Sequence, residues 1–286
     1  MMAHAEVISP GLYSTIQDNG RFGFRKFGVP TSGAMDQQSA NLANHLLNNP
    51  TSAAVLEMTM VGPKLIFSAS SLIVITGADM SPKINEKEIS LNMVVAVSKG
   101  DILSFGTLRC GLRSYLAVKG GFQTERVMNS HSFYRPVTIE NVIKKGDRLP
   151  LSPFKSVQHL FASVKADKSL FDSSPLPCFK GPEFDFLESG KTIFTENFSV
   201  GNENNRMGYR LHGKPLRYPA NYSMLTSAVL PGTIQLTPSG QLIALMRDCQ
   251  TTGGYPRILQ LTQESLDRLG QKKTSDLVSF TLIDQR

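Results

Sequence analysis

Two stretches of the chain combine side chains that bind anions with glycines that expose the backbone. The first runs from Thr15 to Asp36 and holds four glycines among charged and aromatic residues. The second runs from Arg247 to Pro256 and joins paired glycines to arginine, amide and hydroxyl groups. A guanidinium fork suits a carboxylate or a phosphate, and glycine lets backbone N–H groups approach a developing oxyanion. These residue types would suit a small polar anion that carries an amide.

The candidate groups divide into a binding set and a proton-transfer set. The carboxylates of Asp18, Glu57 and Asp248 could move a proton during a reaction. An Arg-x-Gly-aromatic-Arg pattern occurs at 21–25 and again at 206–210, which suggests two related β units. The binding set offers guanidinium, amide, hydroxyl and carboxylate groups to a substrate, and consists of Gln17, Arg21, Arg25, Asp36, Arg206, Arg210, Gln250, Thr251, Thr252 and Tyr255.

Several of these residues also have a structural interpretation. Asp18 and Arg21 could pair within their own loop, and Asp36 stands where a side chain caps a following helix. Glu57 lies between two apolar residues and could be the buried partner of an arginine. Cys249 is interpreted as a small buried side chain rather than a nucleophile, because no histidine lies near it in the sequence to activate it.

The first half of the chain predicts short strands separated by turns. Such regular spacing favours a barrel or a sandwich. One helix is predicted after Asp36, with an apolar face of Leu42, Ala43, Leu46 and Leu47, and it ends at Asn49-Pro50. The predicted strands are Leu65–Phe67, Leu72–Ile75, Met93–Val97, Ile102–Phe105 and Ser114–Val118.

A linker is predicted at 152–177, between a domain at 5–151 and a domain at 178–286. The linker is rich in Ser, Lys and Pro, and a turn of helix could form around Leu160, Phe161 and Val164. In the second domain we expect a short helix from Gln263 to Leu269, capped by Thr262 and ended by Gly270. The strands predicted there are Thr192–Phe194, Thr233–Leu236, Leu242–Met246, Ile258–Leu261 and Leu277–Ile283.

The composition of the chain argues against several classes of protein. The chain of 286 residues has a hydrophobic content of 41% and a net charge of +7, but its basic residues are dispersed, so nucleic-acid binding is not expected. Three widely spaced cysteines without a Cys-x-x-Cys pattern predict no disulfide framework and no metal site. Neither a signal peptide nor an apolar run long enough to span a membrane is present, so a cytoplasmic, soluble protein is expected.

Longer motifs carry a resemblance to a known family. The chain resembles the biotin-dependent carboxyltransferase family, also called the allophanate hydrolase subunit 2 family, from about Val7 to Phe280. This family includes the C subunit of ATP-hydrolysing 5-oxoprolinase, part of urea amidolyase and an antagonist of a sporulation-kinase inhibitor. One departure is Asn205, where the family usually has an acidic residue. The matching motifs are Pro10-Gly11, Gln17-Asp18-x-Gly20-Arg21-x-Gly23, Gly28-Val29-Pro30-x-Ser32-Gly33-Ala34-Met35-Asp36 and the run from Gln250 to Pro256.

The resemblance implies a mainly β fold of two cyclophilin-like β-barrel domains with a few short helices. It also implies one subunit of an ATP-dependent 5-oxoprolinase, which together with the A and B subunits converts 5-oxo-L-proline to L-glutamate. ATP would be shared with those partners. The chain lacks a phosphate-binding P-loop and an amidase signature, so we expect it to be inactive alone.

Two alternatives remain open. The chain could be a carboxyltransferase component that acts on urea or a similar amide with carboxybiotin. Biotin would then be carried by another chain, because no Met-Lys-Met attachment motif is present. It could also be a regulatory protein that binds a kinase-inhibitor homologue of the B subunit.

Overall fold

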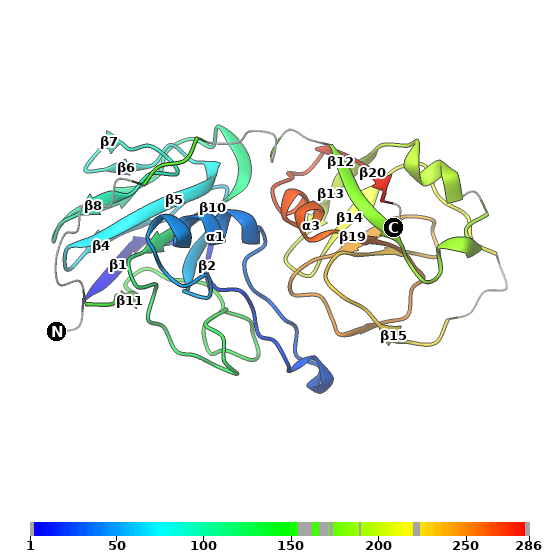
Figure 1. Ribbon diagram of the computed structural model, residues 1–286, viewed down its shortest axis with the longest axis horizontal. Helices are drawn as coiled ribbons and strands as arrows, with labels where there is room; N and C mark the ends of the chain where they lie inside the picture. The colour runs from blue at the N-terminus through cyan, green and yellow to red at the C-terminus, as the bar shows by residue number, and fades with distance from the viewer. Residues whose placement is uncertain are drawn as a thin grey trace. The chain divides into compact units, whose positions relative to one another are not determined.

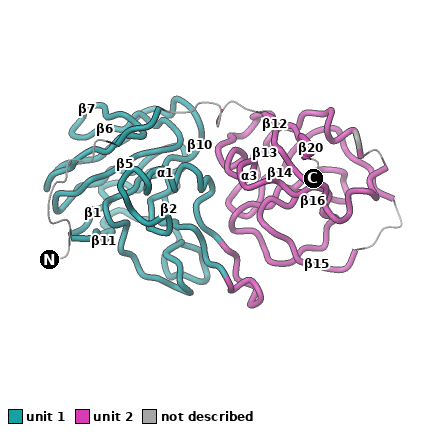
Figure 2. Tube along the Cα trace, viewed as in Figure 1, with its two compact units in different colours: residues 1–22, 32–168 teal, residues 23–31, 169–286 magenta. Residues whose placement is uncertain are grey.

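The computed structural model describes residues 3–153, 162–165, 171, 174–188, 190–219 and 224–283. The chain forms two compact units (Figure 2). The first comprises Met1–Phe22 and Ser32–Lys168, and the second comprises Gly23–Thr31 and Ser169–Arg286. This division differs from the predicted one in two respects. A short segment of the first motif belongs to the second unit, and the first strand of that unit begins at Pro175, inside the predicted linker.

Two sheets form the first unit (Figure 1). The six-stranded sheet has the order β11 (Arg148–Pro150), β1 (His4–Ser9), β4 (Lys64–Phe67), β9 (Ile102–Ser104), β6 (Lys83–Ile84) and β7 (Lys87–Glu88). The five-stranded sheet has the order β2 (Tyr13–Gln17), β3 (Val55–Thr59), β10 (Cys110–Val118), β5 (Ser71–Asp79) and β8 (Val95–Val97).

The core of the first unit draws side chains from both sheets. Val7 and Leu65 of the six-stranded sheet pack in one buried cluster with Leu56, Ile75 and Leu116 of the five-stranded sheet. Neighbouring residues of β5 and β10 alternate to the other face, as strand geometry requires. On that face they pack against the helix α1 (Gln37–Leu46), which completes a second cluster.

The second unit contains a closed barrel. Its strand order is β12 (Pro175–Lys180), β19 (Arg257–Leu261), β16 (Thr233–Leu236), β17 (Leu242–Leu245), β14 (Gly208–His212), β13 (Phe198–Asn204) and β20 (Leu277–Leu282). Parallel pairing of β20 with β12 closes it. The rings of Phe198 and Phe280 lie 5.6 Å apart in its interior. Further elements are β15 (Ser227–Ala228), which pairs with β18 (Thr252–Gly253), the helix α3 (Gln263–Leu269), and the 3-10 helices η1 (Arg25–Phe27), η2 (Phe184–Phe186) and η3 (Gly190–Phe194).

Most sequence predictions of secondary structure are confirmed. The mainly β fold is present, and so is the helix that Asp36 caps. The helix at Gln263–Leu269 has the predicted bounds, and the Thr262 hydroxyl accepts the Ser265 N–H at 3.1 Å. The predicted strands of the first half correspond to β4, β5, β8, β9 and β10, and four of the second half correspond to β16, β17, β19 and β20.

One predicted strand is wrong. Residues 192–194 belong to the 3-10 helix η3, where Ile193 is fully buried and Phe194 stacks on Phe184 with ring centroids 5.7 Å apart. A run of three residues with only two apolar side chains fits a helical turn as well as a strand, so sequence periodicity could not decide between them. The predicted helical turn near residue 160 falls largely outside the described residues, since Leu160 and Phe161 are not among them.

Two classes of feature are not found in the part of the chain that the structure describes. No helix there has the length and apolar character needed to cross a membrane. No group of three or more His, Cys, Asp or Glu side chains in the same ranges is arranged to hold a metal ion.

Candidate functional site

Asp18 of the first motif anchors the segment 127–133 in the first unit. Its Oδ1 accepts the hydroxyls of Ser130 at 2.7 Å and Ser132 at 2.6 Å, and the Gly20 N–H at 2.8 Å. Its Oδ2 accepts the His131 N–H at 2.7 Å. A carboxylate held by four donors fixes the loop conformation. In this arrangement Asp18 has a structural role in its loop.

Gln17 and Arg21 hold the same segment through its backbone carbonyls. The Gln17 amide donates to Phe133 O at 3.3 Å, and Arg21 donates through Nε to Val127 O at 3.1 Å and through Nη2 to Ser132 O at 2.7 Å. Both side chains are completely buried. The Gln-Asp-x-Gly-Arg motif therefore positions the segment 127–133 around itself.

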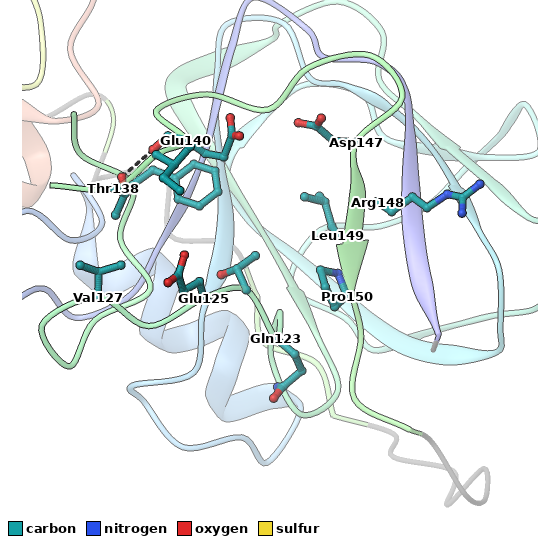
Figure 3. A pocket seen from close by; sticks show the side chains of 12 residues that line it. Gln123, Glu125, Val127, Thr138, Glu140, Asp147, Arg148, Leu149 and Pro150 are labelled. Carbon is teal, nitrogen blue, oxygen red and sulfur yellow. Dashed lines mark hydrogen bonds between the residues drawn. The ribbon is translucent and has the colours of Figure 1, made fainter. Parts of the chain in front are cut away.

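A cavity of about 320 Å³ lies beside that segment (Figure 3). Val127 and Phe133 line it together with strand β11, and the carboxylates of Glu125 and Glu140 belong to its lining. Figure 3 shows Arg148 extending away from the cavity, where its Nε lies 3.7 Å from Glu6 Oε2. The first motif thus shapes one wall of a pocket without lining it, because Gln17, Asp18 and Arg21 all lie outside the lining.

Glu57 belongs to a second buried network of the first unit. Its Oε2 accepts the Met35 N–H at 2.7 Å and the Tyr115 hydroxyl at 2.9 Å, and its Oε1 lies 3.9 Å from Arg113 Nε. The Tyr115 hydroxyl also accepts the Asp36 N–H at 2.8 Å. Burial, then the nearby carboxylates of Glu57 and Asp36, hold the pKa of Tyr115 well above its ordinary value. The predicted alternative of a buried arginine partner for Glu57 is confirmed.

Asp36 caps α1, as the sequence predicts. Its Oδ1 accepts the Ser39 N–H at 2.9 Å, and its Oδ2 accepts the Ser39 hydroxyl at 2.5 Å. The residue is completely buried. Its carboxylate therefore satisfies a helix N-terminus, where a negative charge is favoured.

The second unit gathers the later motifs around an arginine–aspartate pair. Arg206 donates to Asp248 through Nε at 2.7 Å and through Nη2 at 3.2 Å. The neighbouring Arg247 pairs instead with Asp267 of α3 at 2.6 Å. These pairs are almost fully buried. By contrast, Arg210 points outward and pairs with Glu203 at the surface at 2.7 Å.

Arg25 reaches the same region from the short segment 23–31 that belongs to the second unit. Its Nη2 donates to the carbonyl of Val229 and, at 3.5 Å, to the carbonyl of Gln250. Burial raises the pKa of the Cys249 thiol to about 11, even though the Arg25 guanidinium beside it acts in the opposite direction. Cys249 is therefore a protonated, buried side chain at neutral pH, in agreement with the sequence interpretation.

The loop 250–252 follows directly and carries polar side chains for which the described part of the chain supplies no partner. Pairing of β18 with β15, and the Val229 N–H donated to Thr251 O at 3.1 Å, hold its backbone. Within the described ranges, no hydrogen bond engages the side chains of Gln250, Thr251 or Thr252. An amide and two hydroxyls beside a guanidinium are donors that suit a carboxylate or another oxyanion.

The structure thus assigns the predicted residues to separate groups. Arg25, Arg206, Asp248, Gln250, Thr251 and Thr252 come together in the second unit, whereas Tyr255 lines a cavity at one end of the barrel. Asn205 accepts the Met207 N–H at 2.7 Å, a role that the carboxylate usual in the family could also fill. Sequence reasoning missed the partners Ser130, Ser132, Arg113 and Tyr115, which lie in no recognisable motif.

Comparison with known proteins identifies the family. The sequence family described as carboxyltransferase domain, subdomain A and B, matches residues 27–282. The chain belongs to this carboxyltransferase family. Among relatives of this family, the C subunit of 5-oxoprolinase of Escherichia coli is 33% identical over 281 residues, covering 96% of this chain and 90% of that protein.

Two further matches align this chain with part of a longer protein. Urea amidolyase of Lachancea kluyveri is 30% identical, and the match covers 97% of this chain but 17% of that protein. The crystal structure of TTHA0988 superimposes with a TM-score of 0.89 at 28% identity. That match covers 98% of this chain and 55% of the solved chain.

Proposed function

We propose that this chain is one subunit of an ATP-dependent 5-oxoprolinase that cleaves 5-oxo-L-proline to L-glutamate. Support comes from the similarity to the C subunit of 5-oxoprolinase along 96% of this chain. The structural observation that carries the proposal is the loop 250–252 beside Arg25, where the side chains of Gln250, Thr251 and Thr252 have no hydrogen-bond partner among the described residues. These groups would hold the carboxylate and lactam oxygen of 5-oxoproline.

The proposed reaction has two steps. In the first, ATP phosphorylates the lactam oxygen and ADP leaves. In the second, water attacks the activated carbon and the C–N bond breaks as the ring nitrogen takes a proton, and a further water hydrolyses the resulting acyl phosphate to glutamate and phosphate. Negative charge develops on oxygen in both steps, where positioned guanidinium and N–H donors are most effective. Arg25 and the loop 250–252 would supply that stabilisation.

Proton transfer requires a group that this chain's candidate carboxylates do not readily supply. The candidates Asp18, Glu57 and Asp248 each accept short hydrogen bonds from other side chains of the chain. A general base needs a lone pair within reach of the substrate proton. We therefore propose that this chain binds and orients the substrate, and that the A and B subunits of a heteromer complete the ATP site and the proton relay.

Carboxyl transfer is the second candidate. The similarity to urea amidolyase favours it, since that match also extends along nearly all of this chain. In this case the same donors would hold a urea-like amide, and carboxybiotin would arrive on a separate carrier chain. A third candidate, a regulatory protein that binds a homologue of the B subunit, requires a stable complex and no turnover.

The test is reconstitution with homologues of the A and B subunits from the same organism. Glutamate and ADP are measured with and without 5-oxoproline, and each chain is omitted in turn. Glutamate formation that requires all three chains and ATP is the expected result. A stable three-chain complex that forms no glutamate, but accepts a carboxyl group from carboxybiotin onto urea, would replace the proposal with the second candidate.

A further inference from the structure

The larger of the two cavities described lies in the second unit. It has a volume of about 770 Å³ and opens between residues 215–219, which follow β14, the turn joining β16 to β17, and the residues that precede β19. Arg217, Tyr218, Met224, Leu236 and Tyr255 are among its lining residues. Gly254, which lies two residues after the loop 250–252 in the sequence, also lines the cavity.

Backbone hydrogen bonds hold the walls of this cavity in place. Leu216 N–H donates to Gly240 O and Leu236 N–H donates to Pro256 O, each at 3.0 Å. Gly240 has φ +81°, and a Cβ there would lie 2.6 Å from Leu216 O, so only glycine allows this close approach. The parts of the wall held in this way need little reorganisation when a ligand binds.

Two tyrosines and an arginine define the chemistry of the cavity. The Tyr218 hydroxyl donates to Glu183 O at 3.3 Å, and the Tyr218 ring packs against that of Phe186 with the ring centroids 6.3 Å apart. These two contacts fix the Tyr218 side chain. Tyr255 is exposed to 42%. In the described ranges no hydrogen bond or ion pair engages the Arg217 guanidinium. Glu188 adds one carboxylate to the lining, and its N–H donates to the carbonyl of Arg217.

These lining residues and this volume indicate which class of ligand the cavity would bind. Aromatic side chains stack on planar rings, and a guanidinium binds a phosphate. A carboxylate accepts a hydrogen bond from an exocyclic amine. A volume of about 770 Å³ lies within the range of pockets for cofactor-sized ligands and far exceeds what a single five-membered ring would fill.

We propose that this cavity binds a purine nucleotide, with the base against Tyr218 and Tyr255 and the phosphate at Arg217. Under the proposed function, this ligand is the nucleotide that the reaction consumes. The inference thus rests on that function for its biological meaning, and on the cavity for its geometry.

Binding to the full chain without partner subunits provides the test. Isothermal titration uses AMP as the probe, with adenosine and ribose 5-phosphate to separate the contributions of ring and phosphate. AMP should bind at one site per chain, and each fragment should bind at least about tenfold more weakly. Arg217→Ala and Tyr255→Ala should each raise the AMP Kd at least about tenfold. The matched control is Arg109→Ala, which removes another exposed arginine, one that pairs with Glu88 in the first unit.

A filling variant tests the location independently of these contacts. A Cβ built at Gly254 meets no atom within 4 Å, and its backbone φ lies outside the left-handed region. Gly254→Trp should therefore abolish AMP binding while the melting temperature stays within about 2 °C, whereas Gly254→Ala should bind AMP. Circular dichroism of every variant confirms folding.

Two outcomes would overturn the inference. One is the absence of saturable AMP binding at millimolar concentration, and the other is AMP binding that survives Arg217→Ala, Tyr255→Ala and Gly254→Trp unchanged. Either result would leave the proposed function standing if the three-chain complex still forms glutamate. Conversely, AMP binding to a chain whose complex forms no glutamate would leave the cavity assignment standing.

Discussion

Arg206 and Asp248 lie 42 residues apart in the chain and form a buried two-point ion pair, with Nε to Oδ2 at 2.7 Å and Nη2 to Oδ1 at 3.2 Å. A backbone bond from the Asp248 N–H to Arg206 O at 2.8 Å reinforces it. The pair joins the two later motifs immediately before the loop 250–252. Its role in the structure is to fix the start of that loop.

Removing one partner should be costly. Asp248→Ala leaves the Arg206 guanidinium buried without its carboxylate, and breaking such a pair costs about 3–5 kcal/mol. The matched control is Glu203→Ala, which breaks the exposed pair with Arg210 and should cost about 1 kcal/mol or less. Urea unfolding measures both values, and equal losses for the two variants would contradict the account.

The network around Tyr115 predicts a pH dependence of stability. Because folding raises the pKa of its hydroxyl, Tyr115 stabilises the fold below the unfolded pKa. That contribution falls as pH rises above about 10, by up to about 1.4 kcal/mol per pH unit. Tyr115→Phe should lack this part of the slope and should cost about 1–3 kcal/mol at neutral pH, because Glu57 and the Asp36 N–H each lose a partner. Parallel alkaline slopes for the two proteins would refute the assignment.

Cys249 should be chemically inert. With a pKa of about 11, about one thiol in a thousand is ionised at pH 8. Iodoacetamide followed by mass spectrometry should label the half-buried Cys110 well before Cys249. Cys249→Ala should retain glutamate formation in the reconstituted complex. Rapid labelling of Cys249 in the folded protein, or loss of turnover in a folded Cys249→Ala variant, would indicate a reactive thiol.

Asp18 should control the local order of the segment 127–133. Asp18→Asn retains one acceptor oxygen but cannot serve all four donors, so the free energy of unfolding should fall by about 2 kcal/mol or more. Hydrogen exchange should accelerate at the His131 amide at least about tenfold, whereas the amides of β19 should exchange as in the unmodified chain. Unchanged exchange at His131 would show that this carboxylate does not hold the segment.

Local sequence rules predicted the elements whose signals are local. Leu72–Ile75 and Ile258–Leu261 are short runs of mostly aliphatic residues, and both became strands. Asp36 and Thr262 cap their helices through side-chain oxygens, as residue type and position indicate. These signals lie within a few residues of the element that they define.

The strands β2 and β3 gave no such signal. In β2 the polar side chains of Ser14, Thr15 and Gln17 are almost fully buried, and in β3 so is Glu57. Buried polar residues break the alternation that reveals a half-buried strand. Their burial is stabilised by partners such as Phe133 and Tyr115, which lie far away in the sequence.

The sequence predicted which residue types form the candidate site, but not which of these residues lie together. Arginines, amides and hydroxyls near paired glycines indicated an anion site, and several of them do meet in the second unit. The sequence could not show that Arg25 contacts a carbonyl 204 residues away, or that Arg210 points outward to Glu203. Such partners depend on the closed barrel and on where the segment 23–31 lies.

The most direct test of the central claim is the rate of glutamate formation by the reconstituted complex when the loop donors are removed singly. Gln250→Ala, Thr251→Val and Thr252→Val should each leave the melting temperature of this chain unchanged, because their side chains have no partner among the described residues. At least one should lower kcat/KM for 5-oxoproline about tenfold or more. Thr281→Val, at an exposed position on β20, is the matched control. Values of kcat/KM equal to that of the unmodified complex in all three variants would contradict the account.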